Sequence, residues 1–153
     1  MKRLAGTLYL ILAMLIGMGA CCAAQPGTTP LDRSVAFDRQ RALMSEDFSK
    51  AIGSIKVAVA EYYMNMGKLP ASNAQVGIPA PGEYRGRTLQ SATVGEGGVI
   101  ELVFDANSGK AGGRIRLVPD LAHANAMGVQ WRCESPDYRF VRRIIPTCDY
   151  VSR

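Results

Sequence analysis

The feature that most constrains the fold is a proline-free stretch at residues 35–66, whose apolar side chains recur at steps of three and four residues. This spacing places them on one face of an α-helix. The face consists of Met44, Phe48, Ile52, Ile55, Val59, Tyr62, Tyr63 and Met66. Ser34 is placed to cap a helix that starts near Val35, and Gly67 ends it. A second start signal at residues 45–47 leaves open whether the stretch forms one helix or two pieces.

Four downstream segments carry the signals of β-strands, and the last three alternate apolar and polar residues with the period of a strand. They are residues 87–94, 99–105, 114–117 and 127–133. Ile100, Leu102 and Phe104 fall on one face of the second segment, and Pro119 is expected to end the third. Short strands joined by turns favour an antiparallel sheet. The sequence therefore predicts an α+β fold, with a long amphipathic helix packed on a four-stranded antiparallel sheet.

A long connection separates the predicted helix from the first predicted strand. Residues 68–86 contain three prolines and three glycines, which indicates a long, ordered loop. Loops of this length inside a compact domain are often functional. The chain of 153 residues with 48% hydrophobic residues fits one packed domain.

The N-terminal segment has the pattern of a secretory signal. Residues 1–3 carry two positive charges, residues 8–18 are apolar, and small residues follow as far as Ala24. Three outcomes stay open: lipidation at Cys21 within the sequence MGAC, cleavage near Ala24, or an uncut segment long enough to anchor in a bilayer. We expect residues 1–24 to be the signal or anchor, residues 25–34 a linker, and residues 35–153 the globular domain.

If the chain is exported, its cysteines are more readily interpreted as a disulfide than as a metal site. Cys133 and Cys148 lie beyond the signal and are expected to form a disulfide in an oxidising compartment. A metal site is disfavoured because there is no CxxC motif and only one histidine, His123, which we expect in a solvated turn. No phosphate-binding glycine loop is present. We therefore expect no catalytic residue, no metal and no cofactor.

Two motifs together resemble those of type IV pilins. Residues 58–73 (AVAEYYMNMGKLPASN) resemble the end of the pilin helix and the loop that follows it. Residues 129–133 (VQWRC) and 145–148 (IPTC) resemble the pilin W-x-C and P-x-C pair. The resemblance extends over residues 45–148. It implies a long N-terminal helix on a four-stranded antiparallel sheet, with a C-terminal loop closed by a disulfide.

The N-terminus departs from that family's pattern. Type IV prepilins carry a Gly-Phe-Thr-Leu-Ile-Glu-like motif that leads into a continuous apolar helix. Here the apolar segment contains no acidic residue, and residues 25–30 include two prolines. We therefore expect a pilin-like headgroup delivered by a different N-terminus, and an accessory role rather than that of a major pilin.

The resemblance implies a non-enzymatic protein that contacts pilus subunits or other envelope proteins, or takes part in adhesion. The loops at residues 68–86 and 133–148 are the expected contact surfaces. The expected location is outside the cytoplasm of a Gram-negative bacterium, either lipid-anchored to the outer membrane or periplasmic or at the cell surface. The membrane contact is expected through the N-terminal segment.

An alternative hypothesis is a DNA-binding, pilin-like receptor. The formal charge of +5 does not by itself indicate nucleic acid, but arginines gathered on a sheet face and a loop can pair with phosphates. The candidates for binding a partner or DNA are Arg85, Arg87, Arg114, Arg116, Arg132, Arg139, Arg142 and Arg143.

Overall fold

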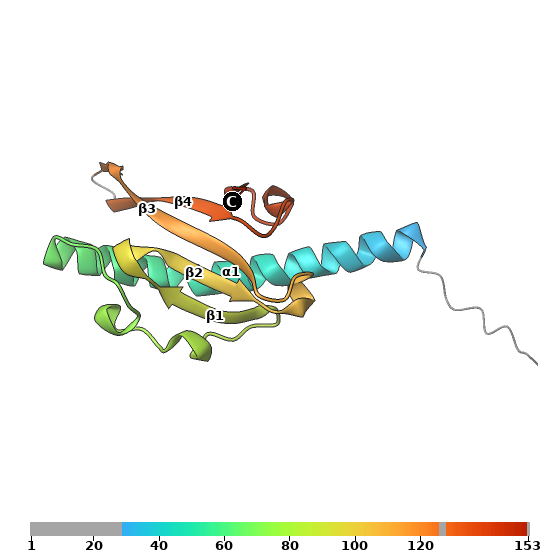
Figure 1. Cartoon of the computed structure of the whole chain (residues 1–153), viewed down its shortest axis with the longest axis horizontal. Helices are drawn as coiled ribbons and strands as arrows, with labels where there is room; N and C mark the ends of the chain where they lie inside the picture. Colours follow the sequence, from blue (N-terminus) through green and yellow to red (C-terminus); the bar gives the residue numbers. More distant parts are fainter. Residues whose placement is uncertain (1–28, 126–127, 153) are drawn as a thin grey trace, which may run out of the picture.

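One long helix packs against one curved sheet (Figure 1). The computed structural model of the chain describes residues 29–125 and 128–152, so the predicted signal or anchor, with Cys21, lies outside the described residues. The elements are helix α1 (Pro30–Met66) and strands β1 (Leu89–Val94), β2 (Ile100–Phe104), β3 (Gly113–Asn125), β4 (Gly128–Ser135) and β5 (Cys148–Tyr150). In the described part of the chain, no helix combines the length and hydropathy needed to span a bilayer.

Helix α1 is a single helix of 37 residues, which decides between the two alternatives left open by the sequence. It begins at Pro30 and not near Val35, so the predicted cap at Ser34 is wrong and residues 30–34 are helical. Thr29 is the cap. Its hydroxyl accepts from the Asp32 N–H at 3.1 Å, and the Asp32 carboxylate accepts from the Thr29 N–H at 3.0 Å. This reciprocal capping box, with proline at the first helical position, satisfies donors that Ser34 could not reach.

The predicted apolar face of α1 is confirmed over its central part. The fully buried apolar side chains of the helix are Met44, Phe48, Ala51, Ile55 and Val59. The face does not continue to the end of the helix as predicted. Tyr62 and Tyr63 are half-buried, and Met66 is 61% exposed beside the helix-ending Gly67. The last turn of α1 therefore lies outside the core.

The sheet has the strand order β1-β2-β3-β4-β5. Its first four strands are antiparallel, as predicted, and the inward face of β2 is confirmed because Ile100, Leu102 and Phe104 are fully buried. The prediction of four strands missed β5, which pairs with β4 in parallel. A strand of three residues is too short to show an alternating pattern.

Strand β3 is longer than its sequence pattern indicated. It runs through Pro119, which pairs in register with Trp131 of β4, and continues to Asn125. The expectation that Pro119 ends the strand is therefore wrong, and so is the placement of His123 in a turn, since His123 lies within β3. Proline lacks only the N–H donor, so a strand can accommodate it where that donor is not needed by the ladder.

Candidate functional site

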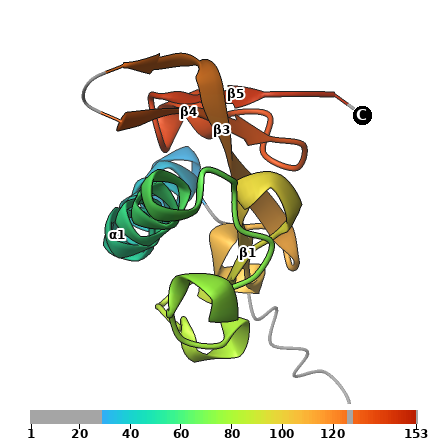
Figure 2. The ribbon, with the colours of Figure 1, turned by 90° about the vertical axis from the view of Figure 1, so that its left-hand side faces the viewer.

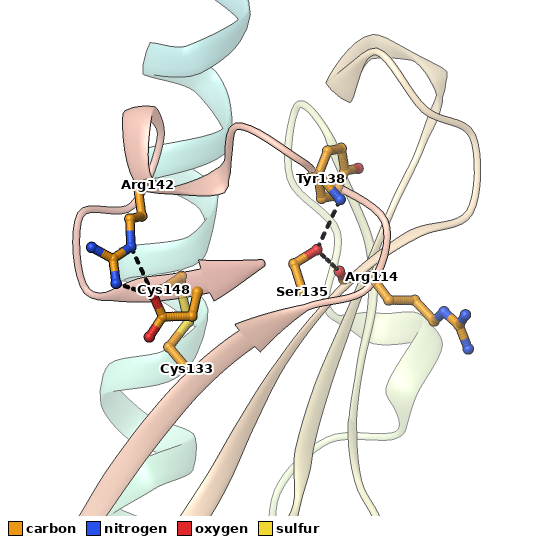
Figure 3. The surroundings of a disulfide bond; sticks show 7 residues. Arg114, Cys133, Ser135, Tyr138, Arg142 and Cys148 are labelled. Atoms are coloured by element: carbon orange, nitrogen blue, oxygen red, sulfur yellow. Dashed lines mark hydrogen bonds and ion pairs between the residues drawn. A yellow bond between two sulfur atoms is a disulfide. The ribbon is translucent and has the colours of Figure 1, made fainter. Parts of the chain in front are cut away.

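The predicted disulfide between Cys133 and Cys148 is confirmed (Figure 3). Cys133 lies in β4 and Cys148 in β5, and the two are register partners in the parallel ladder. The residues between them form the disulfide loop (residues 134–147), which contains the short 3₁₀-helix η5 (Val141–Arg143). The covalent bond thus holds both ends of this loop on neighbouring strands.

Hydrogen bonds fix the start of the disulfide loop to the sheet. The Ser135 hydroxyl donates to the main-chain oxygen of Arg114 at 2.6 Å and accepts from the Tyr138 N–H at 3.1 Å (Figure 3). The Tyr138 hydroxyl shares a buried hydrogen bond of 2.6 Å with Ser108. Burial is the main reason why the pKa of Tyr138 lies above its ordinary value. The loop is therefore part of the folded body.

Asp137 places a charge network beside this loop. Its carboxylate accepts from Lys110 at 2.8 Å and from the Arg114 guanidinium at 3.1 Å. Burial raises the pKa of Asp137, but these hydrogen bonds outweigh that effect and the net pKa is lowered. Asp137 is therefore ionised at neutral pH and compensates much of the positive charge of its two partners.

A groove of about 380 Å³ lies between α1, the β2–β3 turn and the disulfide loop. Two exposed aromatic side chains line it, Phe37 of α1, which is 37% exposed, and Phe140 of the loop, which is 62% exposed, beside the buried Tyr138. Arg139 also lines the groove, and the Arg143 guanidinium lies 5.2 Å from the centre of the Phe140 ring. Exposed aromatic rings beside arginines are the typical composition of a protein contact surface.

Four of the eight predicted arginines form ion pairs within the fold. Arg116 lies on the outer face of the sheet, where it pairs with Glu134 at 3.3 Å and with Glu101 at 3.8 Å. The other pairs are Arg114 with Asp137, Arg132 with Asp120, and Arg142 with Asp149. These pairs reduce the positive potential that the sequence indicated for the sheet face.

The remaining arginines lie in two separate places. Arg139 lines the groove beside the disulfide loop, and Arg143 lies against the Phe140 ring. Arg85 and Arg87 precede β1, where the Arg85 side chain donates to the main-chain oxygen of Gly82 at 3.1 Å. Within the described residues, no cluster of three or more histidine, cysteine, aspartate or glutamate side chains is arranged to hold a metal ion.

The second predicted contact surface, residues 68–86, is confirmed as a long ordered loop and is called the strap below. It contains two short 3₁₀-helices, η1 (Ala74–Val76) and η2 (Pro81–Glu83). Figure 2, which looks along α1, shows the strap at the β1 end of the sheet, with β4 and β5 at the opposite end. The two predicted contact loops therefore lie at opposite edges of the sheet.

Asp47 is a key residue that sequence reasoning missed. The residue is 6% exposed, and its carboxylate accepts from the N–H and hydroxyl of Thr88, both at 2.7 Å, and from the Leu89 N–H at 3.1 Å. Sequence reasoning considered Asp47 only as part of a possible helix start. A signal was available, because Asp47 lies three residues after Met44 and four before Ala51 and so falls on the buried face of the helix.

Comparison with known proteins identifies the family. The model of the pilin family (bacterial filament) matches residues 41–149. Over 97 residues the chain is 36% identical to fimbrial protein EcpC of Eikenella corrodens, a match that covers 62% of each chain. It is 32% identical over 98 residues to a fimbrial protein of Neisseria meningitidis serogroup A, covering 63% of this chain and 55% of the relative.

The region matched by the family model includes the main parts of the fold described above. It runs from the middle of α1 through the whole sheet to β5, and it includes both disulfide cysteines. The chain spans only 55 to 62% of the length of these two relatives. The long helix, the sheet, the closed loop and the match of the family model lead to one conclusion, which is that this chain belongs to the pilin family.

Proposed function

We propose that the chain is a non-enzymatic, pilus-subunit-like protein of the bacterial surface that acts through protein contacts made by its disulfide loop. The observation that carries this proposal is the groove in which Phe37 and Phe140 are exposed beside Arg139 on a rigidly held loop. The family and the fimbrial relatives from Gram-negative bacteria support the same general role.

The rigidity of this surface favours binding. The ends of the loop are held by the disulfide, its start by Ser135, and its body by the buried side chains of Tyr138 and Val141. A surface that is already ordered loses little conformational entropy when a partner binds. Phe140 therefore projects from a fixed base and suits the role of an anchor in a partner's pocket.

An accessory role, rather than that of a major subunit, is part of the proposal. Its support is the sequence before the helix, where the apolar segment carries no acidic residue and residues 25–29 lead into a helix capped at Thr29. Lipidation at Cys21 would anchor such a subunit to the outer membrane. Mass spectrometry of the mature protein tests this part, since an N-terminus at Gln25 would exclude the lipid anchor.

The contact surface is tested by capturing partners of the full chain from its host. R139E and F140A are expected to lose the partners that the wild-type chain retains. R132E is a matched control because it makes the same change of charge on the outer face of the sheet. Equal capture by all variants would contradict a role for the groove, and equal capture from a host without pilus genes would contradict a pilus role.

DNA binding remains the second candidate, and one observation favours it. Phe37, Phe140 and Arg139 bring aromatic rings and a positive charge together, the combination on which single-stranded bases stack. Binding of a single-stranded oligonucleotide by the full chain should then weaken steeply as salt rises. R139E should weaken it further, whereas binding that does not respond to salt would contradict this alternative.

A further inference from the structure

The groove between α1, the β2–β3 turn and the disulfide loop is poor in acceptors for hydrogen bonds from a ligand. Its charged lining consists of Lys110, Asp137 and Arg139. The two carboxylate oxygens of Asp137 are already used, because they accept from Lys110 at 2.8 Å and from the N–H and guanidinium of Arg114, each at 3.1 Å. The Asp137 side chain is also only 12% exposed. Among the described residues that line the groove, the one acid therefore has little capacity left for a cation of a ligand.

The donors of the groove, by contrast, have capacity to spare. Arg139 is exposed and forms no ion pair or hydrogen bond with the described part of the chain. The half-buried amide of Gln40 in α1 likewise has no hydrogen-bond partner among the described residues. Gly109 makes room for this amide, because a Cβ atom at Gly109 would collide with it. Lys110 adds a third donor, since an ammonium group has three N–H bonds and Asp137 takes one.

Cations also outnumber acids along the rim of the groove. The Arg143 guanidinium lies 5.2 Å from the centre of the Phe140 ring, and Arg41 of α1 donates to the main-chain oxygen of Arg143 at 3.3 Å. Asp38 lies 3.8 Å from Arg41, but both side chains are exposed, so this pair compensates little charge. The local potential therefore attracts an anionic group and repels a cationic one.

The rest of the lining is largely apolar. Phe37 and Phe140 expose their rings, and the buried Ile144 also lines the groove. A small inorganic anion would gain nothing from these rings, whereas a ligand that carries an apolar group next to its negative charge would also bury apolar surface. An acidic residue beside an apolar residue in a peptide segment has this composition.

A nucleic-acid strand matches the charges less well. It carries a phosphate at every nucleotide and so needs a series of available cations. The sheet does not supply them, because Arg114, Arg116 and Arg132 are each paired with an acid of the fold. The free donors are concentrated in the groove, which suits one or two carboxylates better than a polyanion.

We propose that the groove binds an acidic segment of a partner protein. A glutamate or aspartate side chain of the segment pairs with Arg139, and a neighbouring apolar side chain packs against Phe37 and Phe140. The Gln40 amide donates to a main-chain carbonyl of the same segment. The inference rests on the proposed function, which assigns the protein contacts to this groove, and it adds the chemistry of the partner.

The test selects short random peptides from a display library on the immobilised full chain in detergent. We expect the selected peptides to carry a glutamate or aspartate beside a leucine, phenylalanine or tryptophan. One selected peptide is then synthesised with an amidated C-terminus, which excludes the terminal carboxylate as the ligand, and its affinity is measured by fluorescence polarisation. Exchange of its acidic residue for the corresponding amide should weaken binding about tenfold, the effect of one lost charge-assisted hydrogen bond.

A charge swap separates recognition from a merely structural effect. R139E should reverse the preference, so that it binds a lysine version of the peptide more tightly than the acidic version. R132E makes the same change of charge on the outer face of the sheet and should keep the wild-type preference. Both arginines are exposed, so neither variant disturbs the core. F140A should weaken the acidic and the amide peptide by the same factor, because it removes only the apolar contact.

Selected peptides without acidic residues, equal affinity for the acidic and amide peptides, or an R139E variant with the wild-type preference would overturn the inference. Binding of a single-stranded oligonucleotide by a chain that selects no acidic peptide would overturn it in favour of nucleic acid. The inference and the proposed function can fail separately. If F140A loses the partners captured from the host while the peptides show no preference for acids, the contact surface stands and the partner chemistry is wrong.

Discussion

The Asp47 carboxylate in the middle of α1 accepts hydrogen bonds from both the backbone N–H and the hydroxyl of Thr88, each at 2.7 Å, immediately before β1. A buried carboxylate requires such partners, because leaving an ion in the interior without compensation is strongly unfavourable. Asp47 and Thr88 are 41 residues apart in the chain. The pair therefore fixes where β1 begins relative to the helix.

We expect D47N to lower the free energy of unfolding by about 1–3 kcal/mol, since the hydrogen bonds from Thr88 and Leu89 lose their charged acceptor. Urea denaturation of the full chain measures the change. D38N is the matched control on the exposed face of α1 and should change stability by less than about 0.5 kcal/mol. Equal effects of D47N and D38N would contradict the role of Asp47.

The Asp47 carboxylate should also make the free energy of unfolding depend on pH. Burial raises the pKa of Asp47, but hydrogen bonds from the Thr88 hydroxyl and the N–H groups of Thr88, Leu89 and Arg87 outweigh burial, so the net pKa lies below the ordinary value of 3.8. Because the unfolded chain takes up the proton first, the stabilisation is complete above about pH 4–5 and is lost as pH falls through the native pKa. The stability difference between wild type and D47N should therefore be constant from about pH 7 to 5 and shrink below pH 4. Denaturation curves across this range measure it, and an equal difference at pH 3 and pH 7 would contradict the assignment.

Gly86 is expected to tolerate no side chain. A Cβ atom at this position would collide with the Asp47 carboxylate, so G86A should destabilise the protein by about 1–3 kcal/mol. G82A, in the same strap, meets no atom within 4 Å and is the matched control. Thermal denaturation compares the two variants. In the double variant G86A/D47N the effects should not add, because both act on the same contact.

Removing the disulfide should lower stability by about 3 kcal/mol, the chain-entropy estimate for a loop of this size. The sequence separation of Cys133 and Cys148 is 15 residues. Guanidinium denaturation of wild type and C133A/C148A, each with and without reductant, tests this. Reductant should destabilise wild type and leave the variant unchanged. A variant as stable as the oxidised wild type would contradict the expected stabilisation.

Y138F should cost about 1 kcal/mol, because it removes the buried hydrogen bond between the Tyr138 hydroxyl and Ser108. Y150F removes a hydroxyl from an exposed tyrosine of β5 and serves as the control. The readout is the midpoint of urea unfolding. If both variants have the midpoint of the wild type, the Tyr138 hydroxyl does not hold the disulfide loop in place.

The sequence predicted helix and strand faces correctly where an element buries one face and leaves the other exposed. The central face of α1 and the inward face of β2 follow directly from their periods, and the cysteine pair was predicted on the expectation of export. The start of α1 was missed because two polar residues compete for the cap. The capping box of Thr29 with Asp32 prevails over Ser34, since it satisfies two donors instead of one.

The remaining features depend on contacts distant in sequence. Strand β5 exists because the disulfide loop returns its three residues to β4, and no local pattern contains that information. The pairing of four of the eight candidate arginines with acids likewise depends on contacts distant in sequence, as for Arg116 between Glu101 and Glu134. Asn73 lies in a loop whose composition predicts only a turn, while its buried side chain forms hydrogen bonds with the main chain of Ala92 and Val94 in β1.

The continuity of α1 has a mechanical consequence. A helix of 37 residues is a rod about 55 Å long, and Figure 1 shows its first turns projecting beyond the end of the sheet. The side chains that lock it into the core begin only at Met44. The helix is continuous from Pro30 to that core, so it transmits force and torque without an intervening hinge. A pull or a twist applied at Thr29 reaches the whole headgroup without a hinge to absorb it, and the groove at Phe140 turns with it.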